Sequence, residues 1–111
     1  MQLRLLGTNT RNGGSPTLYA SDRDTYVVLG WEVPQRDSRH IEIPHALLAY
    51  LEYGTCLGTL LEDTGHGTFV LAGEPVTDTT ALAVIKPPAG ERSIEVPRGK
   101  EIRPDDGTNH Q

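Results

Sequence analysis

Apolar and β-branched residues gather most densely between Thr25 and Val33, in the run Thr-Tyr-Val-Val-Leu-Gly-Trp-Glu-Val. Residues of these types are enriched in strands, and successive side chains of a strand point to opposite faces of a sheet. The two faces of this run carry Val27, Leu29, Trp31 and Val33 on one side and Tyr26, Val28, Gly30 and Glu32 on the other. Both faces are apolar in the first half of the run, so we expect it to form a central strand.

The same pattern returns later in the chain. Thr68 to Val76 matches Thr25 to Val33 in four of nine positions, and Arg92 to Pro97 matches Arg39 to Pro44 in four of six. Agreement in two separate segments indicates an internal duplication, and such a repeat fixes the unit of a fold. We therefore predict two repeat units, about 17–54 and 60–103, that pack together with approximate two-fold symmetry. The alternative is chance similarity between two β-rich segments.

One helix is predicted, from His45 to Tyr53. Pro44 suits a helix start because its missing N–H is not needed there, and Gly54 suits the stop. Three leucines between them recur on one stripe of a helix. The predicted fold class is therefore α+β and mainly β, with two similar antiparallel strand units from an internal duplication and one helix (about 45–53) packed on the sheet.

The remaining segments follow from the repeat and from composition. Residues 98–103 follow a proline as the predicted helix does, and are expected to be helical by analogy. One helical turn is expected at Thr77 to Ala83, inside the longer loop of the second unit. We expect residues 1–103 to form a single domain and the polar residues 104–111 to form a disordered tail.

The charge of the chain limits its partners. Ten Lys and Arg stand against fifteen Asp and Glu, which gives a net charge of −5. Nucleic acid and anionic membranes are bound mainly through clustered Lys and Arg, so both are disfavoured as partners, whereas a protein partner is not. Cys56 is the one cysteine, which excludes an intramolecular disulfide and suits a reducing compartment. No run reaches the roughly 18 apolar residues of a membrane span, and we expect a soluble, cytoplasmic protein.

Residues that could carry catalysis or hold a metal do not form a recognisable motif. The four histidines and Cys56 lack the paired spacing of a zinc site, so no metal or cofactor is predicted. Asp37, Ser38 and His40 are the residue types of a hydrolytic triad, but triads are built from separated elements rather than from one loop. Glu42 and Glu95 are equivalent in the two units, and paired carboxylates can act as acid and base. The favoured interpretation of both is an outward residue beside an arginine, and we predict no enzyme.

Trp31 is the candidate residue for partner binding. Its counterpart in the second unit is Glu74, so the repeated fold does not require an aromatic side chain there. Tryptophan is enriched in the hot spots of protein interfaces, which makes Trp31 a candidate contact. Packing of Trp31 in the core is the alternative.

The segment from Pro16 to Leu51 resembles a group of small proteins of filamentous actinobacteria. The matching motifs are Ser-Pro-Thr-Leu-Tyr, Thr-Tyr-Val-Val-Leu-Gly-Trp and Ile-Glu-Ile-Pro before the leucine-rich stretch. The segment is more distantly similar to the BldB-type developmental regulators, which share the tripeptide Arg36-Asp37-Ser38. The resemblance implies a non-enzymatic regulatory or interaction protein that self-associates. Because BldB-type chains carry one such unit and this chain carries two, either a homodimer or a duplication that replaces the dimer stays open.

A second resemblance lies in the last quarter of the chain. Ile94 to Gly107 is similar to the pattern of swapped-hairpin antitoxins and transition-state regulators, which are DNA-binding dimers. It implies an alternative function as a small DNA-binding or antitoxin-like transcriptional regulator. The acidic balance of the chain and the missing basic loop favour the protein-interaction module instead.

Overall fold

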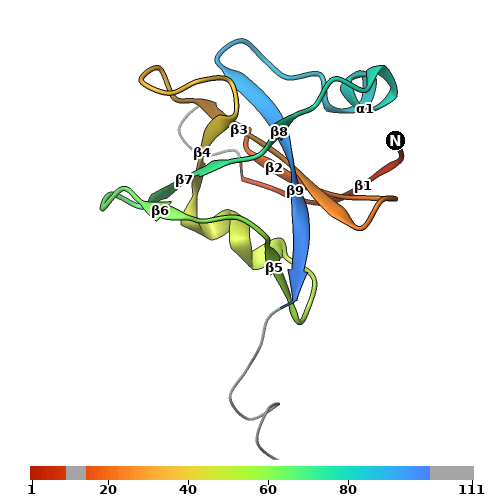
Figure 1. The fold of residues 1–111 in the computed structure, drawn as a ribbon, viewed down its shortest axis with the longest axis horizontal. Helices are drawn as coiled ribbons and strands as arrows, with labels where there is room; N and C mark the ends of the chain where they lie inside the picture. The colour runs from red at the N-terminus through yellow and green to blue at the C-terminus, as the bar shows by residue number, and fades with distance from the viewer. Residues whose placement is uncertain (10–14, 101–111) are drawn as a thin grey trace, which may run out of the picture.

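The structure is a computed structural model that describes residues 1–9 and 15–100. About half of the described residues lie in strands, and the sheet is antiparallel, as the sequence predicts (Figure 1). The strands are β1 (Leu3–Thr8), β2 (Thr17–Ser21), β3 (Thr25–Glu32), β4 (His40–Pro44), β5 (Thr55–Leu57), β6 (Glu62–Asp63), β7 (Thr68–Ala72), β8 (Glu74–Pro75) and β9 (Glu91–Lys100). Within the described residues, two helical elements accompany them, the 3-10 helix η2 (His45–Tyr50) and the α-helix α1 (Thr79–Ile85).

Strand β3 is central, as its two apolar faces predict. The strands follow the order β1-β2-β3-β4-β7-β6, and β9 runs along the other side of β3 down the middle of the molecule (Figure 1). The long strand β9 also pairs with β8 and β5. Residues 26–30 of β3 are all buried, because this strand has a neighbour on each edge and packed side chains on each face.

The two predicted repeat units exchange strands with each other. Strand β3 of the first unit pairs with β9 of the second, and β4 pairs with β7. The registers correspond position by position: Val28 faces Ile94 as Leu71 faces Ile41, and Trp31 faces Glu42 as Glu74 faces Glu95. The two segments are therefore equivalent in the ladders, and their origin by duplication stays a prediction.

Gly30 and Gly73 each lie where another backbone comes close. A Cβ atom at Gly30 would lie 2.7 Å from the carbonyl oxygen of Glu42, and a Cβ atom at Gly73 would lie 2.7 Å from that of Glu95. Because real Cβ atoms do not approach so closely, both positions require glycine. The mid-strand glycines therefore mark a close backbone approach in each unit.

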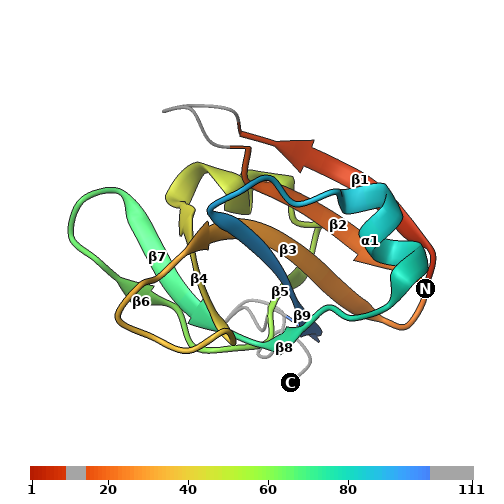
Figure 2. The same cartoon turned by 90° about the horizontal axis from the view of Figure 1, so that it is seen from above.

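The core has two parts, one on each face of β3. The larger part joins Leu47 of η2 to inward residues of six strands, with Tyr26 and Val28 contributed by β3. The smaller part lies on the opposite face of β3, where α1 covers β2 and β3 with Ala81 and Ile85 (Figure 2). The helical elements thus cover opposite faces of the central strand.

The helical segments differ from the predicted ones in extent. The helix expected at 45–53 is a 3-10 helix that ends at Tyr50, and Leu47 is its one fully buried residue. The turn expected at Thr77 to Ala83 is the α-helix α1, which begins two residues later because Asp78 caps it. The other expected helix is wrong for residues 98–100, which are the end of β9 and pair with β5. Residues 101–103 and the expected tail at 104–111 lie outside the described residues.

Candidate functional site

Trp31 lies at the end of β3, between two acidic neighbours. In the antiparallel ladders it stands directly opposite Glu42 on β4 and Glu91 on β9. Residues that face each other in this way project from the same face of a sheet. The Trp31 side chain is half-buried, so it is neither a core residue nor a fully exposed one.

Trp31 lines a hollow of about 300 Å³, which we call the Trp31 hollow. Three further segments form the walls, because the β4–η2 junction, the β6–β7 turn and the end of β1 all come together beside β3. The lining residues besides Trp31 are Pro44, His45 and Ala46, then His66, Gly67 and Thr68, and lastly Asn9. A volume of about 300 Å³ is at the lower end of ligand-binding pockets, and is large enough to receive one side chain of a partner.

His45 is held in place by two neighbours at the wall of the hollow. Its ring stacks on that of Phe69 with centroids 4.1 Å apart, and its Nε2 lies 3.2 Å from the Thr68 carbonyl oxygen and 3.3 Å from Asp63 Oδ1. The Gly65 N–H donates to Asp63, and this hydrogen bond, followed by the nearby imidazole, lowers the pKa of the Asp63 carboxyl. A carboxylate therefore stays charged at this edge of the hollow.

Glu42, which stands opposite Trp31, places a second carboxylate beside the wall residues Thr68 and His66. Thr68 Oγ1 donates a hydrogen bond of 2.6 Å to Glu42 Oε2, and His66 Nε2 lies 3.6 Å from the same oxygen. Among the described residues that line the hollow, none is Lys or Arg. The charges on and beside the hollow are therefore negative unless a histidine takes up a proton.

The two units share some side-chain contacts and differ in the residues that line the Trp31 hollow. Thr25 Oγ1 donates to Glu95 as Thr68 Oγ1 donates to Glu42, at 2.6 Å in both cases. The hollow residues Trp31, His45 and His66, in contrast, correspond to Glu74, Arg98 and Arg23 of the other unit. The shared threonine–glutamate contact belongs to the fold, whereas the three differing residues mark the Trp31 hollow as the candidate functional site.

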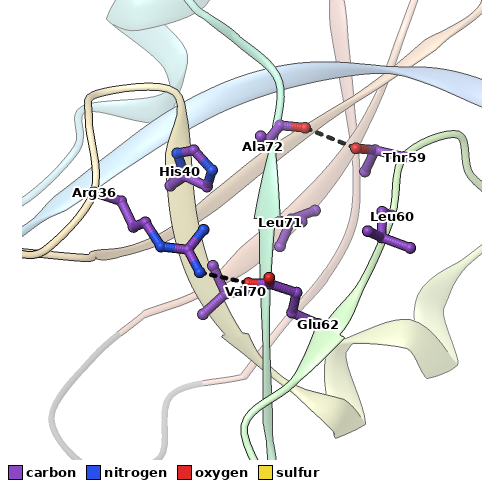
Figure 3. Close-up of a pocket in the computed structure, with 8 residues that line it drawn as sticks. All are labelled: Arg36, His40, Thr59, Leu60, Glu62, Val70, Leu71 and Ala72. Atoms are coloured by element: carbon purple, nitrogen blue, oxygen red, sulfur yellow. Dashed lines mark hydrogen bonds and ion pairs between the residues drawn. The ribbon is translucent and has the colours of Figure 1, made fainter.

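A second hollow, of about 120 Å³, lies beside β7 (Figure 3). Arg36 and His40 border it on one side of β7, and Thr59 and Leu60 on the other. Arg36 closes an ion pair of 2.8 Å with Glu62, and Thr59 Oγ1 donates to the Ala72 carbonyl oxygen at 3.0 Å. This hollow is smaller than the Trp31 hollow, and these polar groups already satisfy one another.

The candidate catalytic residues take part in separate contacts. His40 Nδ1, at the start of β4, lies 2.9 Å from Asp37 Oδ1 on the preceding loop, and the hydrogen bond between them lowers the pKa of the Asp37 carboxyl. Glu42 and Glu95 serve separate ladders, each bonded to its own threonine. In the described part of the chain, no three His, Cys, Asp or Glu side chains are grouped to hold a metal ion.

Glu91 is a residue of this region that the sequence did not single out. It is 9% exposed, and its Oε2 accepts a hydrogen bond of 3.1 Å from the Ser15 N–H. Its Oε1 is buried and has no hydrogen-bond partner among the described residues. No pattern marks Glu91, because it follows a Pro-Gly-rich loop that reads as solvent-exposed. The alignment of the two units could have indicated His45 and His66, since each of them aligns with an arginine of the other unit.

Comparison of the chain with protein-family models found no match, and comparisons with curated proteins and with solved structures found no significant match. The residues 1–9 and 15–100 contain no helix that is both long enough and apolar enough to cross a lipid bilayer.

Proposed function

We propose that this chain is a non-enzymatic protein-interaction module of the cytoplasm with a regulatory role, and that the Trp31 hollow is its contact surface. One observation carries the proposal: the first unit places a half-buried tryptophan at a concave site where the second unit has an ordinary charged residue. Aromatic side chains anchored in such pockets dominate the free energy of many protein interfaces. The regulatory role rests on the resemblance of Pro16 to Leu51 to the BldB-type regulators.

The charge pattern supports a protein partner over nucleic acid. Six arginines of the described chain are already in ion pairs with glutamates, namely Arg4, Arg23, Arg36, Arg39, Arg92 and Arg98. Binding to nucleic acid draws on Lys and Arg that are free to replace counterions at phosphates. An antitoxin-like or DNA-binding role therefore gains no support from this surface.

A capture experiment with two aromatic variants tests the proposal. Wild type, Trp31→Ala and Tyr53→Ala are used as baits in lysate of the native host, with reversible cross-linking and quantitative mass spectrometry. Tyr53 is a matched control, because it is an aromatic residue that is 87% exposed and does not line the hollow. We expect the proteins captured by wild type to fall at least tenfold with Trp31→Ala, as for a hot-spot residue, and to be retained with Tyr53→Ala.

Two outcomes would contradict the proposal. Equal capture by wild type and Trp31→Ala would remove the hollow as the contact surface, and loss of capture with both variants would indicate a general defect of the surface. Light scattering on the purified chain decides whether the partner is a second copy, since a homodimer would double the mass of 12.1 kDa. Far-UV circular dichroism of each variant checks that the fold is intact.

A further inference from the structure

We propose that the Trp31 hollow binds a basic side chain, an arginine or a lysine, of the partner protein. This inference rests on the proposed function and adds the chemistry of the group that is recognised. The inference follows from the acidic residues beside the indole ring of Trp31, Glu42 and Glu91.

The first step is the register of the strands. Glu42 and Glu91 stand directly opposite Trp31, one on each neighbouring strand. Directly opposite residues have Cβ atoms about 4.5–5.5 Å apart, so both carboxylate side chains leave the sheet beside the indole. A cation placed over an indole face is attracted by the negative face of the ring, and here it would also approach one or both carboxylates.

The second step is the unpaired oxygen of Glu91. This side chain is nine-tenths buried, and only one of its two carboxylate oxygens is hydrogen-bonded within the described residues. A buried carboxylate oxygen without a partner destabilises a fold, and such groups persist in proteins where they serve a purpose. A guanidinium or ammonium group brought to Trp31 would supply the missing positive charge nearby. Glu91 also borders a hollow of about 200 Å³ on the side of β8 and α1.

Within residues 1–9 and 15–100, no lysine or arginine lines the Trp31 hollow. Two arginines that occupy equivalent positions in the two units already have other partners. Arg92 pairs with Glu32 at 3.3 Å, and Arg39 pairs with Glu74 at 3.0 Å. Glu74 of the second unit, the counterpart of Trp31, is paired with Arg39 of the first unit and so shows that a cation can be bound at this position. In the first unit, no described arginine or lysine is paired beside Trp31, and we expect a cation from another molecule to bind there.

Other ligand chemistries fit less well. An anionic group would meet Glu42 and Asp63, which flank the walls, and repulsion between like charges disfavours binding. A purely apolar group would cover Trp31 and Pro44 but would bury the nearby carboxylates without a partner. The net charge of −5 adds a long-range attraction for a basic partner.

Trp31 makes the test specific, because it is the one tryptophan of the chain. The indole N–H resonance of wild-type protein is followed by ¹H–¹⁵N NMR during titration with the peptide Ac-Gly-Arg-Gly-NH2, and with the same peptide containing lysine, citrulline or glutamate. Citrulline has nearly the shape of arginine without its charge. We expect saturable shifts with arginine and lysine at millimolar peptide, and at least tenfold weaker binding of citrulline and glutamate.

Two further arms locate the charge. Glu42→Gln should weaken binding of the arginine peptide about tenfold. The control Glu62→Gln replaces an acidic residue that lines the smaller hollow beside β7, and should leave the binding unchanged. Raising the salt concentration from 50 to 300 mM should weaken binding several-fold, as expected for an exposed charge pair. The citrulline arm uses wild-type protein, so it decides the question even if Glu42→Gln does not fold.

The proposal is overturned if citrulline binds as tightly as arginine, if the glutamate peptide is preferred, or if the indole resonance does not move at about 20 mM peptide. Its failure can be told from failure of the proposed function. If capture depends on Trp31 but the indole resonance does not respond to basic peptides, the proposal of a bound basic side chain is wrong and the proposed interaction module is retained. Capture that ignores Trp31 would remove the contact surface itself.

Discussion

Single residues decide how closely the strands of the two units approach. Gly30 and Gly73 each face a backbone carbonyl and the side chains of the neighbouring strand, with distances from a built Cβ atom of 2.7–3.1 Å. A repeated mid-strand glycine in the sequence is enough to predict a close approach of some kind. Which strand approaches each glycine could not be predicted, because glycine has no side chain that would indicate a packing partner.

Alanine at these two glycines should destabilise the protein by similar amounts. Gly30→Ala and Gly73→Ala should each lower the free energy of unfolding by about 1–3 kcal/mol, since overpacking forces a neighbour to shift. Gly54→Ala is the comparison, because a Cβ there meets nothing within 4 Å and only the positive φ of 77° is strained, at about 1 kcal/mol. Urea unfolding followed by circular dichroism measures all three, and a neutral Gly30→Ala would contradict the close approach.

The residues of the candidate site were predictable only in part. Trp31 could be identified as a candidate contact residue because it aligns with a glutamate, Glu74, in the other unit. Glu91 could not, since the hydrogen bond that it accepts comes from Ser15, a residue 76 positions away. The Trp31 hollow likewise needs four segments to meet, and contacts between distant segments leave no local pattern in a sequence.

Among the elements, strands were easier to predict than helices. The β-branched runs at 25–33, 40–43 and 68–76 define β3, β4 and β7 to within a few residues. The segment after Pro97 has the same Pro start as η2 but continues as strand, because β5 lies alongside and pairs with residues 98–100. Tertiary pairing thus overrides a local signal that is shared by the two units.

Helix α1 depends on the residue that caps it. Asp78 accepts a hydrogen bond from the Ala81 N–H at 2.9 Å and contacts the N-terminal ammonium group at 3.1 Å. The hydrogen bond, followed by the ammonium group, lowers the pKa of the Asp78 carboxyl. A depressed pKa in the folded state contributes stability above the ordinary aspartate range, near pH 4, and that stability is lost as the pH falls through the depressed value.

Removing the cap should therefore lower the melting temperature at neutral pH and have less effect in acid. Asp78→Ala should lower Tm by a few degrees at pH 7, with a smaller difference from wild type below about pH 3. Asp78→Asn keeps a capping oxygen and removes the charge, so it should lose less. Differential scanning calorimetry at both pH values measures the difference. An Asp78→Ala loss that does not depend on pH would show that the charge of Asp78 contributes nothing.

At the scale of the whole molecule, the two units cannot be pulled apart without breaking the sheet. Each unit gives one strand to the other, with β3 on β9 and β7 on β4. The longest ladder joins Thr25 to Pro97 and Trp31 to Glu91, so it ties together residues more than half the chain apart. The core on one face of β3 also draws side chains from both units. Neither unit therefore has a complete core of its own.

This exchange predicts a single unfolding transition for both units. In urea, the fluorescence of Trp31, which lies in the first unit, and the far-UV circular dichroism of the whole sheet should have the same midpoint. Gly73→Ala changes only the second unit, yet it should lower both midpoints equally, because loss of β7 and β8 removes partners of β4 and β9. If Trp31 kept its wild-type midpoint while the circular dichroism shifted, the units would fold separately, and the exchanged strands would not be what holds the molecule together.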